Sequence, residues 1–346
     1  MTSSIWPSFL GFLALIALGS CQTWTTCSPT LRQCPADAGL TSPTYFVDFT
    51  RGATDQWKSI GTGDVTYSSS GAAFTISRKG QSPTLETAWY FFFGRAEVHM
   101  RAAPGTGIVS CIVLESDDLD EIDWEWLGGS PNEVQTNYFG KGNTTTYDRG
   151  GKSGVINTQG ATHNYTIDWT PAAITWYIDS VVVRTLAYTD AVGGKNFPQT
   201  PMRLKLGIWA GGDPDNANGT IAWAGGVTDY GKGPFTMVVE SVTVTNANPA
   251  KSYSYSDFSG DWTSIVKNSY YATSSRAKGL AGDEVGIGSS LYEGFKLGSG
   301  SDTDNAPLLE NMVSRGISNV VRGSGCPWII CVIWLPVGVV LLPFFF

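Results

Sequence analysis

Residues 119–128 read Leu-Asp-Glu-Ile-Asp-Trp-Glu-Trp-Leu-Gly, and this stretch decides the fold. The acids at strict two-residue spacing are Glu121, Asp123 and Glu125. Large apolar residues fill the positions between and after them: Ile122, Trp124 and Trp126. Because a β-strand sends alternate side chains to opposite faces, the pattern predicts a strand with one acidic and one apolar face. Like charges this close disfavour ionisation, so core packing does not account for the acidic row.

Cleavage of a glycosidic bond does account for the row, because it uses one carboxylate and one carboxylic acid flanking the bond. On a straight strand the Cα atoms of Glu121 and Glu125 lie about 13 Å apart. Retaining enzymes hold the two carboxyl groups about 5–5.5 Å apart, and inverting enzymes about 6.5–9.5 Å. Side chains that lean together on a concave strand close most of this gap, so the spacing is compatible with either a retaining or an inverting mechanism. Asp123 can bond a neighbour and help to keep Glu125 protonated while Glu121 is ionised.

The rest of the chain predicts an all-β domain. From residue 44 onward, short runs rich in Val, Ile, Thr and aromatic residues alternate with Gly, Asn, Asp and Ser clusters, which is typical of strands joined by tight turns. No long segment before the C-terminal tail has the apolar period of a helix. Such a pattern indicates a β-sandwich or barrel. The expected strands include residues 71–77, 94–101, 108–114, 165–169, 174–178, 181–186, 202–209 and 237–245, with Asp179 and Ser180 in a hairpin turn.

Both ends of the chain resemble targeting signals. Residues 1–21 contain a short apolar run followed by small residues, as in a secretory signal peptide. Residues 326–346 are almost wholly apolar with no basic residue after them, which favours a GPI-attachment signal over a retained transmembrane helix. Residues 22–42 form an N-terminal lead, residues 43–270 the β domain, and residues 271–325 a Gly/Ser-rich linker or stalk. We therefore expect an extracellular protein on a lipid anchor.

An extracellular location also assigns the cysteines and the glycosylation motifs. Cys27 and Cys34 lie in the lead and are expected to form a disulfide. Cys111 has no obvious partner and lies in an apolar strand, so we expect a buried thiol. Three Asn-x-Thr motifs are candidate glycan acceptors and indicate surface positions: Asn143, Asn164 and Asn218.

Other classes of function find little support in the sequence. The net charge of −8 argues against nucleic acid, which binds basic surfaces. No cofactor or metal-binding motif is present, and the histidines, His99 and His163, are too few for a convincing metal site. A row of acids can bind calcium, but calcium loops use flexible turns and not a Trp-flanked strand. We therefore expect no cofactor and no metal.

The acidic stretch resembles glycoside hydrolase family 16, and more narrowly the Crh group of fungal cell-wall transglycosylases, which join chitin to β-glucan. The resemblance runs from about Cys27 to about Trp262. Its unbulged acid motif is similar to that of the Crh and plant xyloglucan enzymes more than that of bacterial lichenases. Further matching segments are residues 93–95 with Glu97, and residues 103–109, 135–140, 168–171, 176–179, 207–209, 211–213 and 223–226.

This resemblance implies a concanavalin-like jelly roll of two antiparallel sheets with a concave substrate cleft, and a retaining mechanism. By position, Glu121 is the nucleophile, Asp123 its helper and Glu125 the general acid/base. Trp209 matches a sugar-stacking position, and Glu97 and Asn137 match groups that bond sugar hydroxyls. Weaker candidates for substrate contact are Trp223, Tyr138 and Phe139.

The expected activity is therefore transfer of a chitin or β-glucan donor to β-glucan or chito-oligosaccharide acceptors, with chitin and β-glucan as partners and a monomeric enzyme. A β-glucan endohydrolase is the alternative within the enzyme class, because the two differ in how well acceptor sugars outcompete water. A carbohydrate-binding jelly roll without activity is a further alternative, but a lectin does not need the intact Glu-x-Asp-x-Glu trio.

Overall fold

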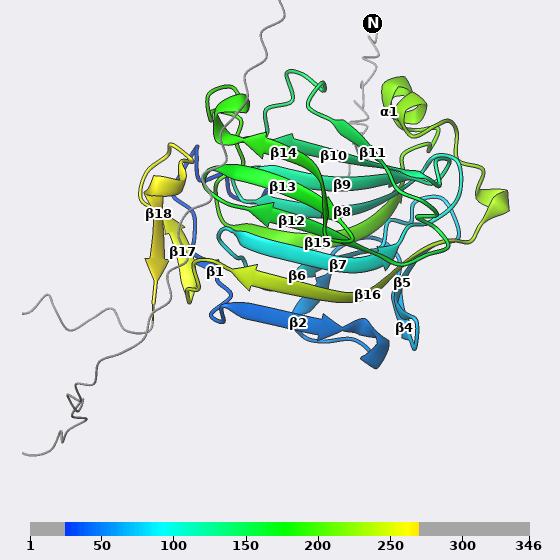
Figure 1. The fold of residues 1–346 in the computed structure, drawn as a ribbon, viewed down its shortest axis with the longest axis horizontal. Helices are drawn as coiled ribbons and strands as arrows, with labels where there is room; N and C mark the ends of the chain where they lie inside the picture. Colours follow the sequence, from blue (N-terminus) through cyan, green and yellow to red (C-terminus); the bar gives the residue numbers. More distant parts are fainter. Residues whose placement is uncertain (1–24, 270–346) are drawn as a thin grey trace, which may run out of the picture. The chain divides into compact units, whose positions relative to one another are not determined.

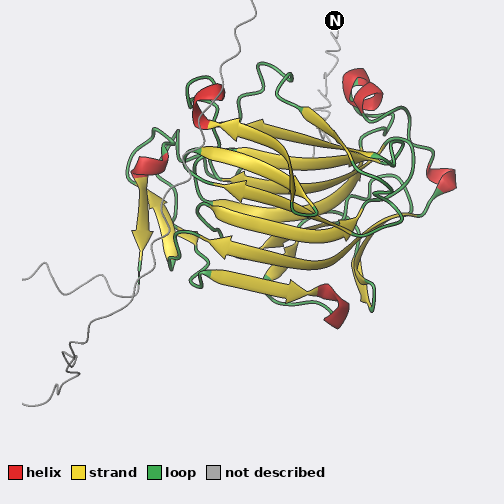
Figure 2. Ribbon diagram, in the orientation of Figure 1, coloured by secondary structure: helices red, strands yellow, loops and turns green. Residues whose placement is uncertain are grey.

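The computed structural model describes residues 25–269, which form a β-sandwich of antiparallel sheets (Figures 1 and 2). The predicted all-β jelly roll is confirmed. We call the sheet that carries the acid row the acid sheet. Its strands, in order across the sheet, are β11 (Gly151–Gly154), β10 (Glu133–Phe139), β9 (Glu121–Leu127), β8 (Ile108–Ser116), β15 (Met202–Ala210), β6 (Thr84–Thr87) and β3 (Trp57–Ser59).

The second sheet packs against the apolar face of the acid sheet. Its strands, in order, are β14 (Val181–Ala187), β13 (Ala173–Ile178), β12 (His163–Trp169), β7 (Gly94–Arg101), β16 (Phe235–Asn246), β5 (Gly71–Ile76) and β4 (Val65–Ser68), with β2 (Thr44–Asp48) also paired to β16. The short helices are α1 (Asn218–Trp223) and the 3-10 turns η1 (Phe49–Arg51), η2 (Tyr188–Asp190), η3 (Tyr230–Lys232) and η4 (Trp262–Ser264).

A small third sheet, which the sequence did not predict, ties the N-terminal lead to the end of the domain. It contains β1 (Asp37–Ala38), β17 (Ser252–Tyr255) and β18 (Ile265–Asn268), the last two drawn in yellow in Figure 1. The expected disulfide between Cys27 and Cys34 is present, with their Cα atoms 5.8 Å apart. The lead is therefore held at two points, by this cross-link and by pairing of β1 with β17.

Strand β9 behaves as its two-residue pattern predicts. Ile122, Trp124 and Trp126 are buried between the sheets, with at most 1% of each side chain exposed. Tyr165 of β12 meets both indole rings edge-on, at centroid distances of 5.5 and 4.5 Å. Burying side chains of this size provides much of the apolar stabilisation of the sandwich. The acids on the same strand consequently face away from the core.

The expected strands match the observed ones closely, and the hairpin turn is also correct. Asp179 and Ser180 both have positive φ, 49° and 69°, as the two-residue turn between β13 and β14 requires. The predicted signal peptide and lipid-anchor signal lie outside the described residues, as does nearly all of the predicted stalk. Within residues 25–269, no helix has the length and apolar character needed to cross a membrane.

Candidate active site

The acid row lies on the outward face of the acid sheet, in the middle of three paired strands. Glu121, Asp123 and Glu125 of β9 stand opposite Phe139, Asn137 and Gln135 of β10. On the other side they stand opposite Glu115, Val113 and Cys111 of β8. Because residues paired across antiparallel strands share a face, all nine side chains belong to one surface. We call this surface the floor.

Burial and charge repulsion keep protons on part of the row. Asp123 is 2% exposed. Burial first, and then the charges of Glu121 and Glu125, raise the pKa of Asp123 well above its ordinary value. Burial and the charge of Glu121 raise the pKa of Glu125 to about 8. At neutral pH the row therefore holds Glu125 as a carboxylic acid, which can give a proton to a leaving group.

A hydrogen bond joins Asp123 to Glu121. Since Asp123 is the group that keeps its proton, its hydroxyl donates and the Glu121 carboxylate accepts. This bond holds the Glu121 side chain in place and spreads its negative charge. The row therefore offers one positioned carboxylate and one acid on a single face, which is the pair that glycosidic bond cleavage requires.

Two contacts hold β9 in register under the acids. Asp120 is fully buried, and its carboxylate accepts the backbone N–H groups of Lys141, Gln199 and Thr200 at 2.9, 2.7 and 3.1 Å. The indole N–H of Trp176, from the second sheet, donates to the backbone carbonyl of Asp123 at 3.1 Å. The start and the middle of the strand are thus fixed, and with them the direction of the acids.

Several predicted substrate-contact residues lie on or beside the floor. Asn137 is paired with Asp123. Trp209 of β15 packs with Val109 and Leu127 beyond Glu125 and is 8% exposed. Trp223 of α1 lies beside Trp209, with ring centroids 6.1 Å apart, and donates its indole N–H to Gln135 at 3.0 Å. Their contact with sugar stays a prediction.

The predictions for Glu97 and Tyr138 are wrong. Glu97 lies on β7 of the second sheet, between the buried residues Ala96 and Val98, so it points to the outer face on the far side of the sandwich. There it pairs with Arg95. Tyr138 is opposite the core residue Ile122 and is itself buried in the core. Neither side chain can contact a sugar bound over the floor.

The sequence reading overlooked other floor residues, namely Gln135, Glu115 and Cys111. The position of Gln135 can be predicted from the sequence, because Gln135 and Phe139 lie two residues either side of Asn137 on β10 and must share its face. The positions of Glu115 and Cys111 on β8 cannot, because all nine residues of that strand are buried and no alternation of polar and apolar residues distinguishes its faces. Cys111 is buried as expected, is not part of a disulfide and donates its thiol to the carbonyl of Gly207 at 3.4 Å, but it lies on the floor beside Glu125.

Glycine-rich loops close the floor beyond Trp209. The amide of Gly212 donates to the carbonyl of Gly107 at 2.9 Å, and that of Gly107 to Ala224 at 3.2 Å. A Cβ atom on Gly212 would stand 2.1 Å from the carbonyl oxygen of Gly226. Three segments far apart in the sequence meet here at a separation that only glycine permits.

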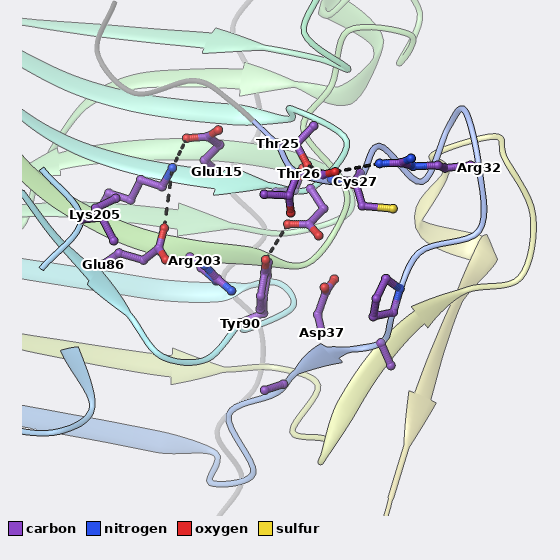
Figure 3. A pocket seen from close by; sticks show the side chains of 16 residues that line it. Thr25, Thr26, Cys27, Arg32, Asp37, Glu86, Tyr90, Glu115, Arg203 and Lys205 are labelled. Atoms are coloured by element: carbon purple, nitrogen blue, oxygen red, sulfur yellow. Dashed lines mark hydrogen bonds and ion pairs between the residues drawn. The ribbon is translucent and has the colours of Figure 1, made fainter. Parts of the chain in front are cut away.

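A pocket of about 660 Å³ opens at the other end of the floor (Figure 3). The N-terminal lead forms one wall, including Cys27 and Asp37, and Tyr90 and Asp117 form part of the other. Glu115, which stands opposite Glu121, also lines it. The pocket therefore adjoins the acid row directly.

The three candidate glycan acceptors differ in accessibility. Asn218 is exposed on α1. The side-chain nitrogen of Asn143 donates to Asn196 at 2.9 Å, and that of Asn164 faces Glu97 at 3.5 Å. A glycan on either nitrogen would replace an existing contact. Glycosylation stays a prediction, and Asn218 is the most open of the three sites.

Comparison with known proteins agrees with this geometry. The profile of glycosyl hydrolases family 16 matches residues 53–225. Crh-like protein 5 of Aspergillus fumigatus is 60% identical over 73% of this chain and 64% of its own length, so the match spans somewhat less than two thirds of that relative. Crh-like protein 1 of the same organism is 58% identical over 74% of this chain and 70% of its own.

Among solved structures, a Crh5 transglycosylase in complex with NAG is 61% identical, with a TM-score of 0.69, and is matched over 70% of this chain and 100% of its own. The β-glucanase of Bacillus licheniformis, 22% identical with a TM-score of 0.50, shares the fold over 60% of this chain and 99% of its own. The matched family profile, the Crh-like relatives and the acid row together establish that the chain belongs to glycosyl hydrolase family 16, within its Crh-like group.

Proposed function

We propose that the chain is a retaining transglycosylase of the fungal cell wall, which cleaves a chitin or β-glucan donor and transfers it to a β-glucan or chito-oligosaccharide acceptor. The observation that carries the proposal is the geometry of the acid row, which places Glu121, Asp123 and Glu125 side by side on the outward face of the acid sheet. Glu125 keeps a proton at neutral pH, while Glu121 on the same face accepts a hydrogen bond from Asp123. A relative of solved structure that is 61% identical is a transglycosylase in complex with NAG.

The roles follow from this arrangement. Glu121 attacks the anomeric carbon while Glu125 gives its proton to the leaving glycosidic oxygen, and a glycosyl-enzyme forms. Glu125, now ionised, takes a proton from an acceptor hydroxyl as that oxygen attacks the anomeric carbon and releases Glu121. Asp123 holds the nucleophile by its hydrogen bond through both steps. Asn137, Trp209 and Trp223 are the proposed sugar contacts of the floor.

Transfer and hydrolysis differ only in whether an acceptor sugar or water takes the second step. Transfer is favoured over the endohydrolase alternative by the Crh-like relatives. The proposal includes an extracellular site of action at the cell wall, a lipid anchor added near the C-terminus and a monomeric enzyme. Release of the protein from cells by a phosphatidylinositol-specific phospholipase tests the anchor.

The decisive assay mixes the purified protein with chitin oligomers and a fluorescent laminari-oligosaccharide. A chimeric fluorescent product supports transfer, and new reducing ends alone support the hydrolase. Glu121→Gln should abolish both, because the carboxamide cannot form the glycosyl-enzyme. Glu97→Gln is the matched control, since this glutamate lies on the far side of the sandwich. Retained turnover in Glu121→Gln, or an equal loss in the control, would refute the assignment.

A further inference from the structure

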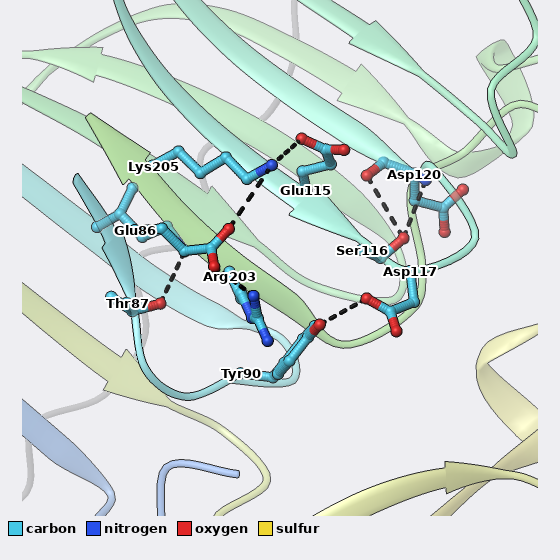
Figure 4. A network of polar contacts seen from close by, with 10 residues as sticks. Glu86, Thr87, Tyr90, Glu115, Ser116, Asp117, Asp120, Arg203 and Lys205 are labelled. Carbon is cyan, nitrogen blue, oxygen red and sulfur yellow. Dashed lines mark hydrogen bonds and ion pairs between the residues drawn. The ribbon is translucent and has the colours of Figure 1, made fainter. Parts of the chain in front are cut away.

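The pocket beside the acid row is charged, and most of its charges are matched. Lys205 donates to Glu115 at 2.5 Å and lies 3.8 Å from Glu86 (Figure 4). Arg203 pairs with the same Glu86. Its guanidinium also lies over the ring of Tyr90, 4.5 Å from the centroid. The two glutamates therefore already have their cations, and neither is available to a charged ligand.

Asp37 and Asp117 differ from these glutamates. Asp117 accepts the hydroxyl of Tyr90 at 2.5 Å. Asp37 comes from the lead, is 7% exposed and shares a hydrogen bond with Asp117. Figure 3 shows its carboxyl group turned toward the space in front of Tyr90. One of its oxygens, Oδ2, has no hydrogen-bond partner.

A buried carboxyl oxygen without a donor is uncommon in folded proteins and calls for an explanation. Burial, followed by the charge of Asp117, raises the pKa of Asp37 to about 8. Asp37 therefore favours its protonated form beside the charge of Asp117, although the charge of Arg203 acts in the opposite direction, and its Oδ2 still lacks a donor. A cation with several N–H groups placed beside both carboxyl groups would let Asp37 ionise and would bond this oxygen.

We propose that this pocket binds the ammonium group of an unacetylated glucosamine unit, placed between Asp37 and Asp117. The inference rests on the proposed function, and it adds partly deacetylated chitin to the substrates of the same cleft. The pocket volume of about 660 Å³ lies within the usual range of small-ligand sites, about 300–1,000 Å³. Glu115 links the pocket to Glu121, so a bound unit belongs to a chain that crosses the floor.

A metal ion is a poorer occupant. Within residues 25–269, no group of three or more His, Cys, Asp or Glu residues is spaced to hold one. A neutral sugar hydroxyl could donate one hydrogen bond to Oδ2 but would leave Asp37 in its protonated form. The ammonium group supplies both the donors and the positive charge that favour ionisation of Asp37.

Binding of three oligosaccharides to the full chain tests the inference by calorimetry: a glucosamine oligomer, its N-acetylated counterpart and a laminari-oligosaccharide. We expect Asp37→Asn to weaken binding of the glucosamine oligomer about tenfold, the typical effect of losing one charge-assisted hydrogen bond. Binding of the two neutral oligomers should not change. Asp64→Asn is the matched control, because it removes one negative charge at an exposed site. A thermal melt of each variant verifies folding, and Asp117→Asn replaces Asp37→Asn if the latter is unstable.

Two results would overturn the inference. One is that the glucosamine oligomer binds no better to the wild type than to Asp37→Asn. The other is an equal weakening of all three oligomers, which would mark the pocket as a general hydroxyl site. Failure of the proposed function is distinct from both, because it would appear as no transfer to any acceptor even where calorimetry detects binding.

Discussion

The proton on Glu125 yields a prediction with two independent measurements. Its pKa is raised from 4.5 to about 8 by burial and by the charge of Glu121. With that pKa, about 90% of Glu125 is protonated at pH 7 and about 10% at pH 9. Since the first step needs the proton, we expect kcat/KM to fall as pH rises, with a midpoint near 8.

The same proton also makes the free energy of unfolding depend on pH. Between pH 4.5 and 8 the folded protein binds a proton at Glu125 that the unfolded chain does not. The contribution of this proton to stability is complete below pH 4.5 and is lost as pH rises through 8. The loss is about 1.4 kcal/mol per pH unit, or at most about 4 kcal/mol from pH 5 to pH 8.

Glu125→Gln has no such proton to lose. The variant should therefore gain stability relative to the wild type over this interval, which corresponds to roughly 8–16 °C in Tm for a domain of this size. Calorimetric melts of both proteins at pH 5, 6, 7 and 8 measure the difference, and taking the difference removes the titration of groups outside the acid row. A Tm difference that stays constant with pH would refute the reasoning, as would an alkaline limb of kcat/KM near pH 5.

Three further substitutions test how the site is held. Asp120→Ala leaves three backbone N–H groups without their acceptor, two of them buried, so we expect a loss of about 3 kcal/mol or more in denaturant unfolding. A loss below about 1 kcal/mol would contradict this. Trp124→Ala removes a fully buried indole from between the sheets and should cost about 3–5 kcal/mol in the same measurement. Asn137→Ala should raise KM about fivefold, corresponding to one lost hydrogen bond to a sugar, with a small fall in Tm because its Oδ1 also accepts the backbone N–H of Tyr138 at 3.0 Å. An unchanged KM would remove Asn137 from the site.

The sequence predicted the fold because the core has a simple period. Strand β9 alternates between acids and large apolar groups, and the observed strand keeps both faces as expected. Two predicted sugar contacts are wrong for different reasons. Tyr138 and Phe139 are both predicted contacts, but adjacent residues on a strand face opposite ways, so the two cannot share the floor. Glu97 is a predicted contact by family resemblance, but its strand belongs to the other sheet, which a single sequence does not reveal.

The pocket could not be predicted because it depends on long-range assembly. Its walls combine the lead with segments from several strands, and Asp37 and Tyr90 are 53 positions apart. The lead reaches its place through pairing with β17, at the other end of the domain. Neither the apolar periodicity of the sequence nor a short motif predicts a pairing between segments this far apart in the chain. The partnerless oxygen of Asp37 likewise became visible only in three dimensions.

The two faces of β9 have different roles, and this limits which substitutions an enzyme of this type can accept. Its odd-numbered residues carry the chemistry and its even-numbered residues hold the two layers together, so a one-residue insertion would exchange the two sets and destroy both. The strand therefore tolerates little mutational change. Altered specificity has to come from its neighbours, and the disulfide-tied lead, which contributes a wall without sharing the core of β9, offers protein engineers the most freedom.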